Sequence, residues 1–377
     1  MKFSINSSSK NTAARSGTLE TERGLIKTPV FMPVGTIGAV KTFSPHELEG
    51  LGAEIILGNT YHLYLRPGTT IVNQSGGLHK FSNWSRPMLT DSGGYQVFSL
   101  ARLNSINDEG VKFQSHLDGS YHTITPEISM EIQRILGSDI IMAFDECPKG
   151  GAETKYISHA VDRTTKWVKR CKIYLDSNPQ LYNHEQILYP IIQGGVNNKL
   201  RKISIESILN YAECGIAIGG LAVGEEKNAM FDTIEYCETL LPKTMPRYLM
   251  GVGKPTDIVK AVRRGMDMFD CVMPTRNGRN GQIFTSEGTI NINNEKFKDD
   301  YTLIDEKSDH AFGRMFTKSY VRHLFNVKEI LGLRIASTLN LSYYFWLMRT
   351  IRENINSGTF DSWSKSWLNK MSNLKGM

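Results

Sequence analysis

Eight short apolar segments recur along the chain, and each of them ends in glycine or a polar residue. Within them Val, Ile, Leu and Met follow one another without alternating with polar residues, which is typical of parallel strands that are buried on both faces. The segments occupy residues 29–35, 54–59, 87–94, 139–146, 187–195, 215–224, 247–253 and 268–278.

Stretches with helical patterning lie between several of these segments, for example residues 126–136, 159–175 and 255–264. Strand and helix that alternate eight times predict an α/β fold, a (β/α)8 TIM barrel. A barrel of this kind builds its site at the carboxyl ends of its strands, where five residues of this chain are expected to meet. They are Asp91, Asp145, Gln193, Gly220 and Asp270.

Two parts of the chain depart from the strand and helix rhythm. Residues 101–121 contain an Asp-Gly turn signal, which predicts a β-hairpin inserted in a loop of the barrel. After Ile292 the apolar segments stop and helical patterning begins, with Phe316, Tyr320 and Leu324 repeating at intervals of four. We therefore expect a barrel over residues 1–292 and an appended helical part over residues 293–377, called the C-terminal region below.

The composition limits the class of protein. Of the 377 residues, 40% are hydrophobic and 22% are charged, a balance that favours a large buried core and excludes a disordered chain. No run of 18 apolar residues and no secretory leader are recognisable, so we expect a cytoplasmic protein without membrane attachment. The five cysteines form no C-x-C or C-x-x-C pair that would predict a metal knot.

The positive charge of the chain is concentrated at one end. The formal net charge is +6, yet residues 311–377 alone hold ten basic and three acidic side chains. The first 310 residues hold 34 basic and 35 acidic ones, so they are close to neutral. The surplus is compatible with a polyanion such as nucleic acid docking there and, equally, with a solvated helical face.

Seven motifs occur in order along the predicted barrel and resemble those of the tRNA-guanine transglycosylase family, closest to its bacterial type. They are GNTYHLYLRPG (58–68), DSGGYQ (91–96), FDEC (144–147), QGG (193–195), GGLAVGE (219–225), YLMGVGKP (248–255) and DCVMPTRNGRNGQ (270–282). The resemblance implies a (β/α)8 barrel enzyme, a pentosyltransferase of queuosine tRNA modification. Such an enzyme exchanges the wobble guanine of GUN anticodons for a 7-deazaguanine.

The resemblance assigns the chemistry to two carboxylates. Asp270 is expected to attack ribose C1′ and to hold the tRNA as a covalent intermediate. Asp91 is expected to act as the general acid that protonates the leaving guanine, and then as the base for the incoming one. A pair of carboxylates divides the work in the same way in retaining glycosidases.

The same resemblance assigns the recognition of the base. Asp145 would accept the N1–H and N2–H donors of a guanine edge, and Gln193 and the Gly220 backbone N–H would bind O6. The Leu221 carbonyl would accept from the aminomethyl group of preQ1 (7-aminomethyl-7-deazaguanine).

The remaining base-pocket residues enclose or orient the ring. Tyr95 and Met250 are expected to sandwich it, as a base removed from its stack requires. Ser92, Gln96 and Tyr248 are expected to complete the pocket.

Pocket volume bears on which deazaguanine is used. Val223 and Cys147 resemble the residues of bacterial enzymes that take preQ1, whereas eukaryotic members have a smaller residue at the position of Val223 and admit queuine. The sequence therefore predicts preQ1, with queuine as the alternative. Lys254, Arg276 and Arg279 match the family's contacts to the anticodon loop, so we expect them to bind tRNA.

The family's zinc motif is missing from the C-terminal region. The positions that correspond to its four ligands hold Ser308, His310, Gly313 and Leu339, whereas a structural zinc site needs four ligands. We therefore predict that the chain binds no zinc, and that aromatic packing replaces it through Phe312, Phe316, Tyr320 and the YYFW run at 343–346. In the family this region grips tRNA and forms a homodimer, so a homodimer is expected here.

Three other interpretations stay open. A non-catalytic tRNA-binding subunit of the same superfamily is disfavoured because Asp91 and Asp270 are both present. A barrel glycosidase acting on nucleosides or sugars would leave the TRNGRNGQ motif (275–282) and the basic C-terminal region unexplained. An archaeal-type enzyme that modifies another tRNA position is disfavoured because no RNA-binding extension follows residue 377.

Overall fold

A closed barrel of parallel strands forms the centre of the computed structural model, which describes residues 1–100 and 104–374. The sheet order is β11-β10-β6-β5-β4-β15-β14-β13-β12, and its neighbours pair in parallel. The strands are β4 (Val30–Gly35), β5 (Ile56–Gly58), β6 (Met88–Thr90), β10 (Ile140–Met142), β11 (Ile187–Tyr189), β12 (Ile191–Ile192), β13 (Ile216–Ile218), β14 (Arg247–Leu249) and β15 (Met268–Cys271). The eight predicted apolar segments all contain one of these strands, and the TIM barrel is confirmed.

The barrel closes at a proline. The two ends of the sheet, β11 and β12, are separated in sequence only by Pro190, which has no N–H to donate to a neighbouring strand. They are therefore two halves of one strand, and the Pro190 carbonyl accepts a hydrogen bond from the N–H of Ala217 at 2.9 Å. The fifth predicted segment thus pairs with β10 through its first half and with β13 through its second.

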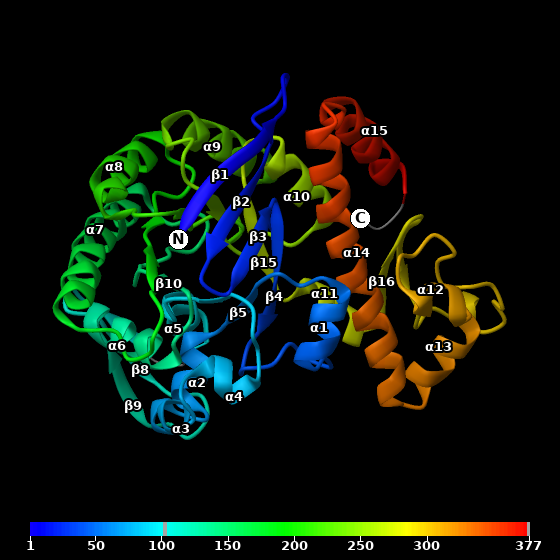
Figure 1. The fold of residues 1–377 in the computed structure, drawn as a ribbon, viewed down its shortest axis with the longest axis horizontal. Helices are drawn as coiled ribbons and strands as arrows, with labels where there is room; N and C mark the ends of the chain where they lie inside the picture. The colour runs from blue at the N-terminus through cyan, green and yellow to red at the C-terminus, as the bar shows by residue number, and fades with distance from the viewer. Residues whose placement is uncertain (101–103, 375–377) are drawn as a thin grey trace.

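Helices surround the barrel, as Figure 1 shows for the arc from α6 to α10. The predicted helices at 126–136, 159–175 and 255–264 correspond to α6, α7 and α10. Local signals define α6: Thr125 caps its first turn, Pro126 opens it, and Gly137 ends it in the left-handed conformation at φ 70°. The helices before the C-terminal region are α1 (Pro45–Leu51), α2 (Thr60–Leu65), α3 (Thr69–Gln74), α4 (Leu78–Ser82), α5 (Gly94–Leu100), α6 (Pro126–Leu136), α7 (Thr154–Ser177), α8 (Asn198–Ile208), α9 (Lys227–Leu240), α10 (Pro255–Val262) and α11 (Met273–Arg279).

A three-stranded antiparallel sheet covers one end of the barrel, and the sequence analysis did not identify it. It consists of β1 (Lys2–Ser8), β2 (Arg15–Thr21) and β3 (Gly24–Thr28). Leu19 and Ile26 of this sheet are fully buried in the hydrophobic cluster that fills the barrel interior. The amino ends of the barrel strands are therefore covered, and Figure 1 shows the sheet lying across them.

The insertion predicted as a β-hairpin is larger than predicted. It is a three-stranded antiparallel sheet of β7 (Asn104–Ile106), β8 (Val111–Gln114) and β9 (Tyr121–Ile124). The predicted turn at Asp118-Gly119 connects β8 and β9, where Asp118 accepts hydrogen bonds from Ser120. The prediction omitted β7 because this strand has only three residues, two of them polar. Residues 101–103 of the predicted segment lie outside the described residues.

A hairpin precedes the C-terminal region, and α-helices form much of that region. The hairpin is β16 (Gln282–Thr285) and β17 (Gly288–Asn291), and the helices are α12 (Ala311–Met315), α13 (Lys318–Asn326), α14 (Ile330–Asn356) and α15 (Phe360–Asn373). The periodic pattern at Phe316, Tyr320 and Leu324 suggested one continuous helix, but the backbone is extended at Phe316. The Thr317 hydroxyl accepts from the N–H of Tyr320 and starts a new helix there.

Helix α14 joins this region to the barrel (Figure 1). It packs against α11, β16 and β4. The Asn340 amide accepts from the N–H of Phe284 at 2.8 Å and donates to the carbonyls of Pro274 and Gln282, each at 2.9 Å. In the described part of the chain neither α14 nor any other helix has the length and apolar character needed to cross a membrane.

Candidate active site

The carboxyl ends of the barrel strands and the loops that follow them form the surface called the mouth below. It carries Asp91 directly after β6, Asp145 after β10, Gln193 after β12, Gly220 after β13 and Asp270 within β15. Four of the five residues predicted to meet follow adjacent strands of the closed sheet, and Asp270 lies on β15, which β14 separates from β13.

Asp91 is buried and held by donors from two loops. One carboxylate oxygen accepts from the backbone N–H groups of Thr60 at 2.8 Å and Gly93 at 3.2 Å, and the other accepts from the Asn59 amide at 2.6 Å. Burial nevertheless raises the pKa of Asp91 to about 7, and the nearby charges of Asp270 and Asp145 raise it further. A carboxyl group with this pKa can both give and take a proton near neutral pH.

Asp270 is oriented by two donors to a single oxygen. The Tyr248 hydroxyl donates to Oδ1 at 2.7 Å, and the Gly251 N–H donates to the same atom at 2.8 Å. Burial raises the pKa of Asp270, and these two hydrogen bonds oppose the shift. Both donors bind Oδ1, which leaves Oδ2 as the oxygen available for attack on an electrophile.

Asp145 and Gln193 form the floor of the mouth. Asp145 accepts from the Ser92 hydroxyl at 3.0 Å and from the Gln193 amide nitrogen at 2.7 Å. Burial is the main reason that the pKa of Asp145 is raised, to about 6, and the charge of Glu146 adds to it. The Gln193 carbonyl oxygen is buried and has no hydrogen-bond partner within residues 1–100 and 104–374.

Gly220 is required by the close approach of Gln193. A Cβ atom added at Gly220 would lie 2.3 Å from the Gln193 Oε1 atom, and the residue has a φ of +63°. Its neighbour Leu221 is buried, whereas Val223 is partly exposed and lines a cavity of about 240 Å³ together with Glu225 and residues 148–152. Gly220 therefore belongs to both the floor of the mouth and the cavity beside Val223.

The sequence analysis missed two residues that hold this loop. The Glu225 carboxylate accepts from the backbone N–H groups of Ala222 at 2.5 Å and Val223 at 2.9 Å. Arg201 is fully buried on α8 and donates to the carbonyls of Gly195, Ile192 and Gly220. The available signal for Glu225 was its place at the end of GGLAVGE, whereas Arg201 sits in an ordinary amphipathic helix and gave none.

The other predicted base-pocket residues differ in exposure. Tyr95 on α5 is 52% exposed, Met250 is half-buried against the cluster of the barrel interior, and Tyr248 is buried. The Gln96 carbonyl oxygen is buried and unpartnered within the described residues. Burial and the charge of Asp145 raise the pKa of the Cys147 thiol to about 12, so this side chain stays neutral.

The three cations predicted to bind tRNA lie on the two elements that follow β14 and β15. Lys254 precedes the first residue of α10, and Arg276 and Arg279 lie on α11. One terminal nitrogen of Arg279 is buried without a hydrogen-bond partner in the described structure. Burial and the charge of Arg276 lower the pKa of Arg279. An anion beside α11 would compensate both effects.

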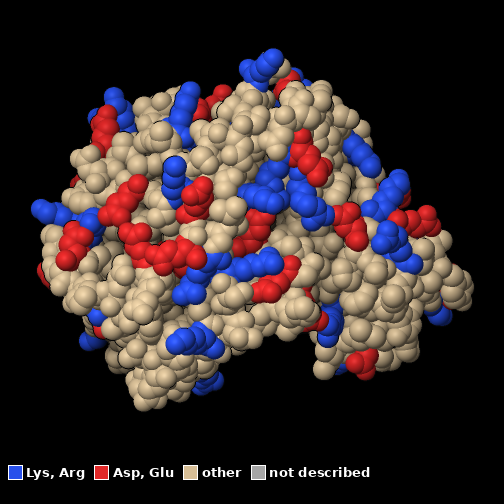
Figure 2. Space-filling view, viewed as in Figure 1, with Lys and Arg blue, Asp and Glu red and all other residues tan. Residues whose placement is uncertain are grey.

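Carboxylates offset much of the positive charge of the C-terminal region. Among the described residues from 311 to 374, five basic side chains form ion pairs, and four of the five partners precede residue 311. The pairs are Lys318–Asp300, Arg334–Glu47, Arg349–Asp309, Arg352–Glu54 and Lys365–Asp361. Figure 2 shows basic and acidic side chains interspersed over the face that it draws. The sequence surplus is therefore not a continuous basic patch on that face.

Three of the four positions that the sequence analysis matched to the family's zinc motif lie together. A Cβ atom on Gly313 would be 2.4 Å from Ser308, and the Ser308 hydroxyl accepts from the N–H of His310. Leu339 is buried in the hydrophobic cluster of the C-terminal region. In the described residues no three His, Cys, Asp or Glu side chains are grouped so that they could hold a metal ion. The predicted absence of zinc stays a prediction.

Aromatic rings connect the surrounding segments, as the sequence predicted. His310, Phe312, Phe316 and Tyr320 form a chain of contacts with ring centroids 4.5, 5.4 and 5.6 Å apart. On α14, Tyr343 contacts Tyr344, Trp346 and Phe284.

The comparison with known protein families agrees with this geometry. The family model described as queuine tRNA-ribosyltransferase matches residues 9–373. The chain belongs to the queuine tRNA-ribosyltransferase family. The resemblance drawn from the seven motifs is thereby confirmed. The matched residues include the whole mouth and nearly all of the C-terminal region.

Members of the queuine tRNA-ribosyltransferase family are similar to the chain over almost their full length. The protein of that name from Halothermothrix orenii is 48% identical over 366 residues, which cover 96% of each chain. The one from Dictyoglomus turgidum is 50% identical over 98% of this chain and 94% of its own length. The one from Francisella tularensis subsp. mediasiatica is 49% identical over 98% of both.

Proposed function

We propose that the chain exchanges the wobble guanine of GUN anticodons for preQ1 through a covalent intermediate between Asp270 and tRNA. As a member of the queuine tRNA-ribosyltransferase family it is a pentosyltransferase of queuosine tRNA modification. The observation that carries the proposal is the pair Asp91 and Asp270, two strand-end carboxylates with different hydrogen-bond donors, of which Asp270 raises the pKa of Asp91 through its charge.

The first half of the reaction would break the bond between guanine and ribose. Asp270 Oδ2 attacks C1′, the C1′–N9 bond breaks, and its electron pair goes to the departing base. Asp91 gives its proton to that base, which leaves as neutral guanine. The raised pKa of Asp91, about 7, supports this role because much of the carboxyl group is protonated at neutral pH.

The second half would restore the glycosidic bond with the new base. Asp91, now ionised, takes the N9 proton of preQ1. The N9 atom of preQ1 attacks C1′, and the ester bond to Asp270 breaks with its electrons returning to the carboxylate. Both carboxylates then regain their starting states, so the exchange needs no other reactant.

Recognition of the base would rest on Asp145 and Gln193. Asp145 accepts from the N1–H and N2–H groups of the base, and Gln193 has a second amide hydrogen available for O6. The unpartnered Gln193 carbonyl oxygen also supports a polar ligand at this point, because an unsatisfied buried polar atom is unfavourable.

The choice of preQ1 over queuine would depend on the loop after β13. Val223 lines the neighbouring cavity of about 240 Å³, and Glu225 binds the N–H groups of this loop. The side chain of Val223 takes up space that the cyclopentenediol of queuine would need, and the Leu221 carbonyl would accept from the amine of preQ1. Exchange of labelled guanine in tRNA by preQ1, but not by queuine, is the expected result. Exchange by queuine alone would contradict this part of the proposal.

The covalent step is tested by trapping. Wild-type protein mixed with an anticodon stem-loop should give an adduct that survives denaturing electrophoresis, and Asp270→Asn should give none. Asp232→Asn, an exposed position on α9, serves as a control that keeps the adduct. Circular dichroism checks that all variants fold. An adduct of normal yield in Asp270→Asn would contradict the proposal. A folded wild type that binds the stem-loop but neither forms an adduct nor exchanges guanine would favour the non-catalytic subunit.

A further inference from the structure

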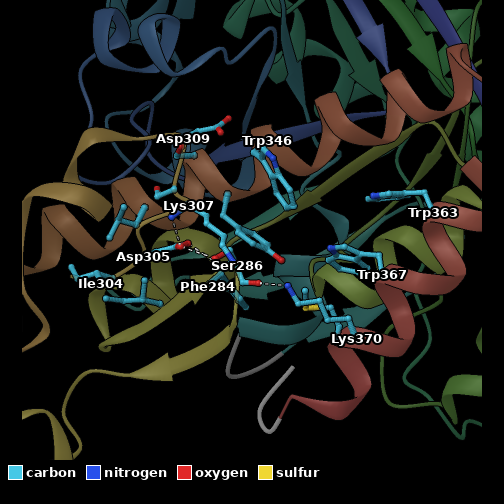
Figure 3. Close-up of a pocket in the computed structure, with 16 residues that line it drawn as sticks. Phe284, Ser286, Ile304, Asp305, Lys307, Asp309, Trp346, Trp363, Trp367 and Lys370 are labelled. Atoms are coloured by element: carbon cyan, nitrogen blue, oxygen red, sulfur yellow. Dashed lines mark hydrogen bonds between the residues drawn. The ribbon is translucent and has the colours of Figure 1, made fainter. Parts of the chain in front are cut away.

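A cavity of about 380 Å³ lies between the hairpin β16–β17 and the C-terminal region, and none of the mouth residues named above lines it. Its walls come from β16, the segment 304–309, α14 and α15 (Figure 3). It shares no residue with the base pocket or with the cavity beside Val223. The proposed exchange reaction therefore leaves this cavity without a role.

Aromatic rings form much of the lining. Figure 3 shows Trp346 extending from α14, and Trp363 and Trp367 extending from α15. The Trp363 and Trp367 rings are nearly parallel, at 26° with centroids 6.0 Å apart, and Trp346 contacts Tyr343 at 5.4 Å. Three of the five tryptophans of the chain therefore line one cavity. Rings arranged in this way favour a flat aromatic ligand, which can stack on them.

Two buried donors of the lining have no partner. The Tyr343 hydroxyl and the Trp367 indole N–H make no hydrogen bond within residues 1–100 and 104–374, although each side chain is only 7% exposed. The indole N–H can only donate, and burial raises the pKa of Tyr343 so that its hydroxyl keeps its proton. Both groups therefore favour a ligand that accepts hydrogen bonds.

The charged groups of the lining also favour an acceptor. Asp305 already accepts from the backbone N–H and the hydroxyl of Ser286, and Asp309 pairs with Arg349. Lys370 donates to the Ser286 carbonyl at 3.0 Å, and no ion pair joins it to a carboxylate of the described residues. The acids at the cavity are thus engaged, and one ammonium group is left with a neutral partner only.

We propose that this cavity binds a small planar aromatic molecule that carries a carboxylate or a comparable anionic group. The rings stack on the tryptophans, and the anionic group accepts from Tyr343 and Trp367 with Lys370 nearby. The bound molecule would satisfy both buried donors, for which no residue of 1–100 or 104–374 supplies an acceptor.

The test uses 2-naphthoate as the probe, measured by isothermal titration calorimetry on the full-length protein. We expect binding of one molecule per chain, with quenching of tryptophan emission. The cationic analogue 2-naphthylmethylamine has the same ring system and should bind at least tenfold more weakly. No binding, or equal binding of the two probes, would overturn the proposal.

Two variants locate the probe. Tyr343→Phe removes one hydroxyl and should weaken 2-naphthoate about fivefold or more, whereas Tyr189→Phe, which removes another buried unpartnered hydroxyl in the barrel, should change nothing. Ser342→Leu should fill the cavity and abolish binding. If Ser342→Leu fails to fold, the affinity of Tyr343→Phe for 2-naphthoate still tests whether the probe binds in this cavity.

A competition arm separates this cavity from the base pocket. Saturating guanine and the variant Asp145→Asn should both leave the affinity for 2-naphthoate unchanged. Displacement of the probe by guanine would place it in the mouth and overturn the proposal. This result does not depend on whether the chain exchanges bases in tRNA.

Discussion

The mouth of the barrel and the C-terminal region hold their segments together in different ways. At the mouth, backbone N–H groups and polar side chains donate hydrogen bonds to three strand-end carboxylates, Asp91, Asp145 and Asp270. In the C-terminal region, ion pairs and contacts between aromatic rings connect the segments. The first arrangement fixes particular oxygen atoms, and the second fixes only surfaces. Replacing a single atom should therefore change activity or binding much more at the mouth than in the C-terminal region.

The two regions also differ in what burial does to charge. Burial raises the pKa of all three carboxylates at the mouth, to about 7 for Asp91 and about 6 for Asp145. Their ionised forms are therefore less favourable in the folded protein than in water, and the hydrogen bonds only reduce this effect. In the C-terminal region the pairs Arg334–Glu47 and Arg349–Asp309 lie at the surface, where solvent screens them and their effect on stability is small, whereas Arg352–Glu54 is partly buried. At the mouth, therefore, burial disfavours charge, whereas the C-terminal region holds charged groups in ion pairs near the surface.

The largest effect is expected from Asp145→Asn, which replaces one carboxylate oxygen at the floor of the mouth by an amide nitrogen. An amide would offer a donor where the base and Gln193 also donate, so kcat/KM for guanine exchange should fall by about 10²–10³-fold. Steady-state exchange of labelled guanine measures this. Ser92→Ala, which removes one donor to the same carboxylate, should lose only about tenfold. An unchanged KM for guanine in Asp145→Asn would contradict the assigned role.

The pH profile of the first half-reaction should follow next in size. The value of kcat/KM for tRNA should fall by about tenfold per pH unit above about pH 7, because the acid form of Asp91 is lost as pH rises through its pKa. It should also fall at low pH, as Asp270, whose pKa is raised, takes up a proton. Single-turnover release of guanine across pH 5–9 measures both limbs. Because the two carboxylates interact, the limbs report pKa values of the pair. A flat profile above pH 7 would exclude Asp91 as the acid.

A smaller effect is expected at the edge of the mouth, from Arg279→Ala. Loss of one phosphate contact should weaken stem-loop binding by about three- to tenfold and reduce the slope of log K against log salt by about 1. Fluorescence anisotropy at several salt concentrations measures this. Lys202→Ala, an exposed position on α8 paired with Glu206, is the control and should leave the slope unchanged. An Arg279→Ala slope equal to that of wild type would remove this residue from the tRNA contacts.

The smallest effect is expected from chelators. If ring packing holds residues 308–339 together without zinc, EDTA should change neither the melting temperature nor the exchange activity. A structural zinc site contributes about 10–16 kcal/mol in zinc-finger peptides, so removal of such a zinc would clearly lower the melting temperature. Elemental analysis of the purified protein should find less than one zinc for every ten chains, and one zinc per chain would refute the prediction.

The barrel was predictable because its strands are continuous apolar runs, a pattern that few other structures share. The sheet of β1 to β3 was not, because its pattern is mixed. Its first strand is mostly exposed, and Arg15 in its second strand is buried through an ion pair with Asp267 that lies 252 residues away. A charged residue at an inward position conceals a strand from any pattern based on hydrophobicity.

At the site too, residues within motifs could be predicted, and residues that act through contacts between loops could not. Asp91 and Asp270 lie in motifs, and their positions at strand ends follow from the fold. Glu225 and Arg201 were missed because they act on backbone groups of the loops that carry Gly220 and Val223. Their role depends on where those loops come together in space, which no spacing along the chain reveals.

The three hydrogen bonds of Asn340 bear on how the protein is made. The barrel strands are complete in sequence at Cys271, but Pro274, Gln282 and Phe284 obtain their Asn340 partner only after about 60 more residues have been synthesised. Tyr344, which donates to the Gly253 carbonyl in the loop beside Asp270, arrives later still. On the ribosome, the part of the mouth around Asp270 is thus among the last to be fixed in place. A chain cut short before α14 would contain Asp91, Asp145 and Asp270 but would lack the helix that holds the loop beside Asp270.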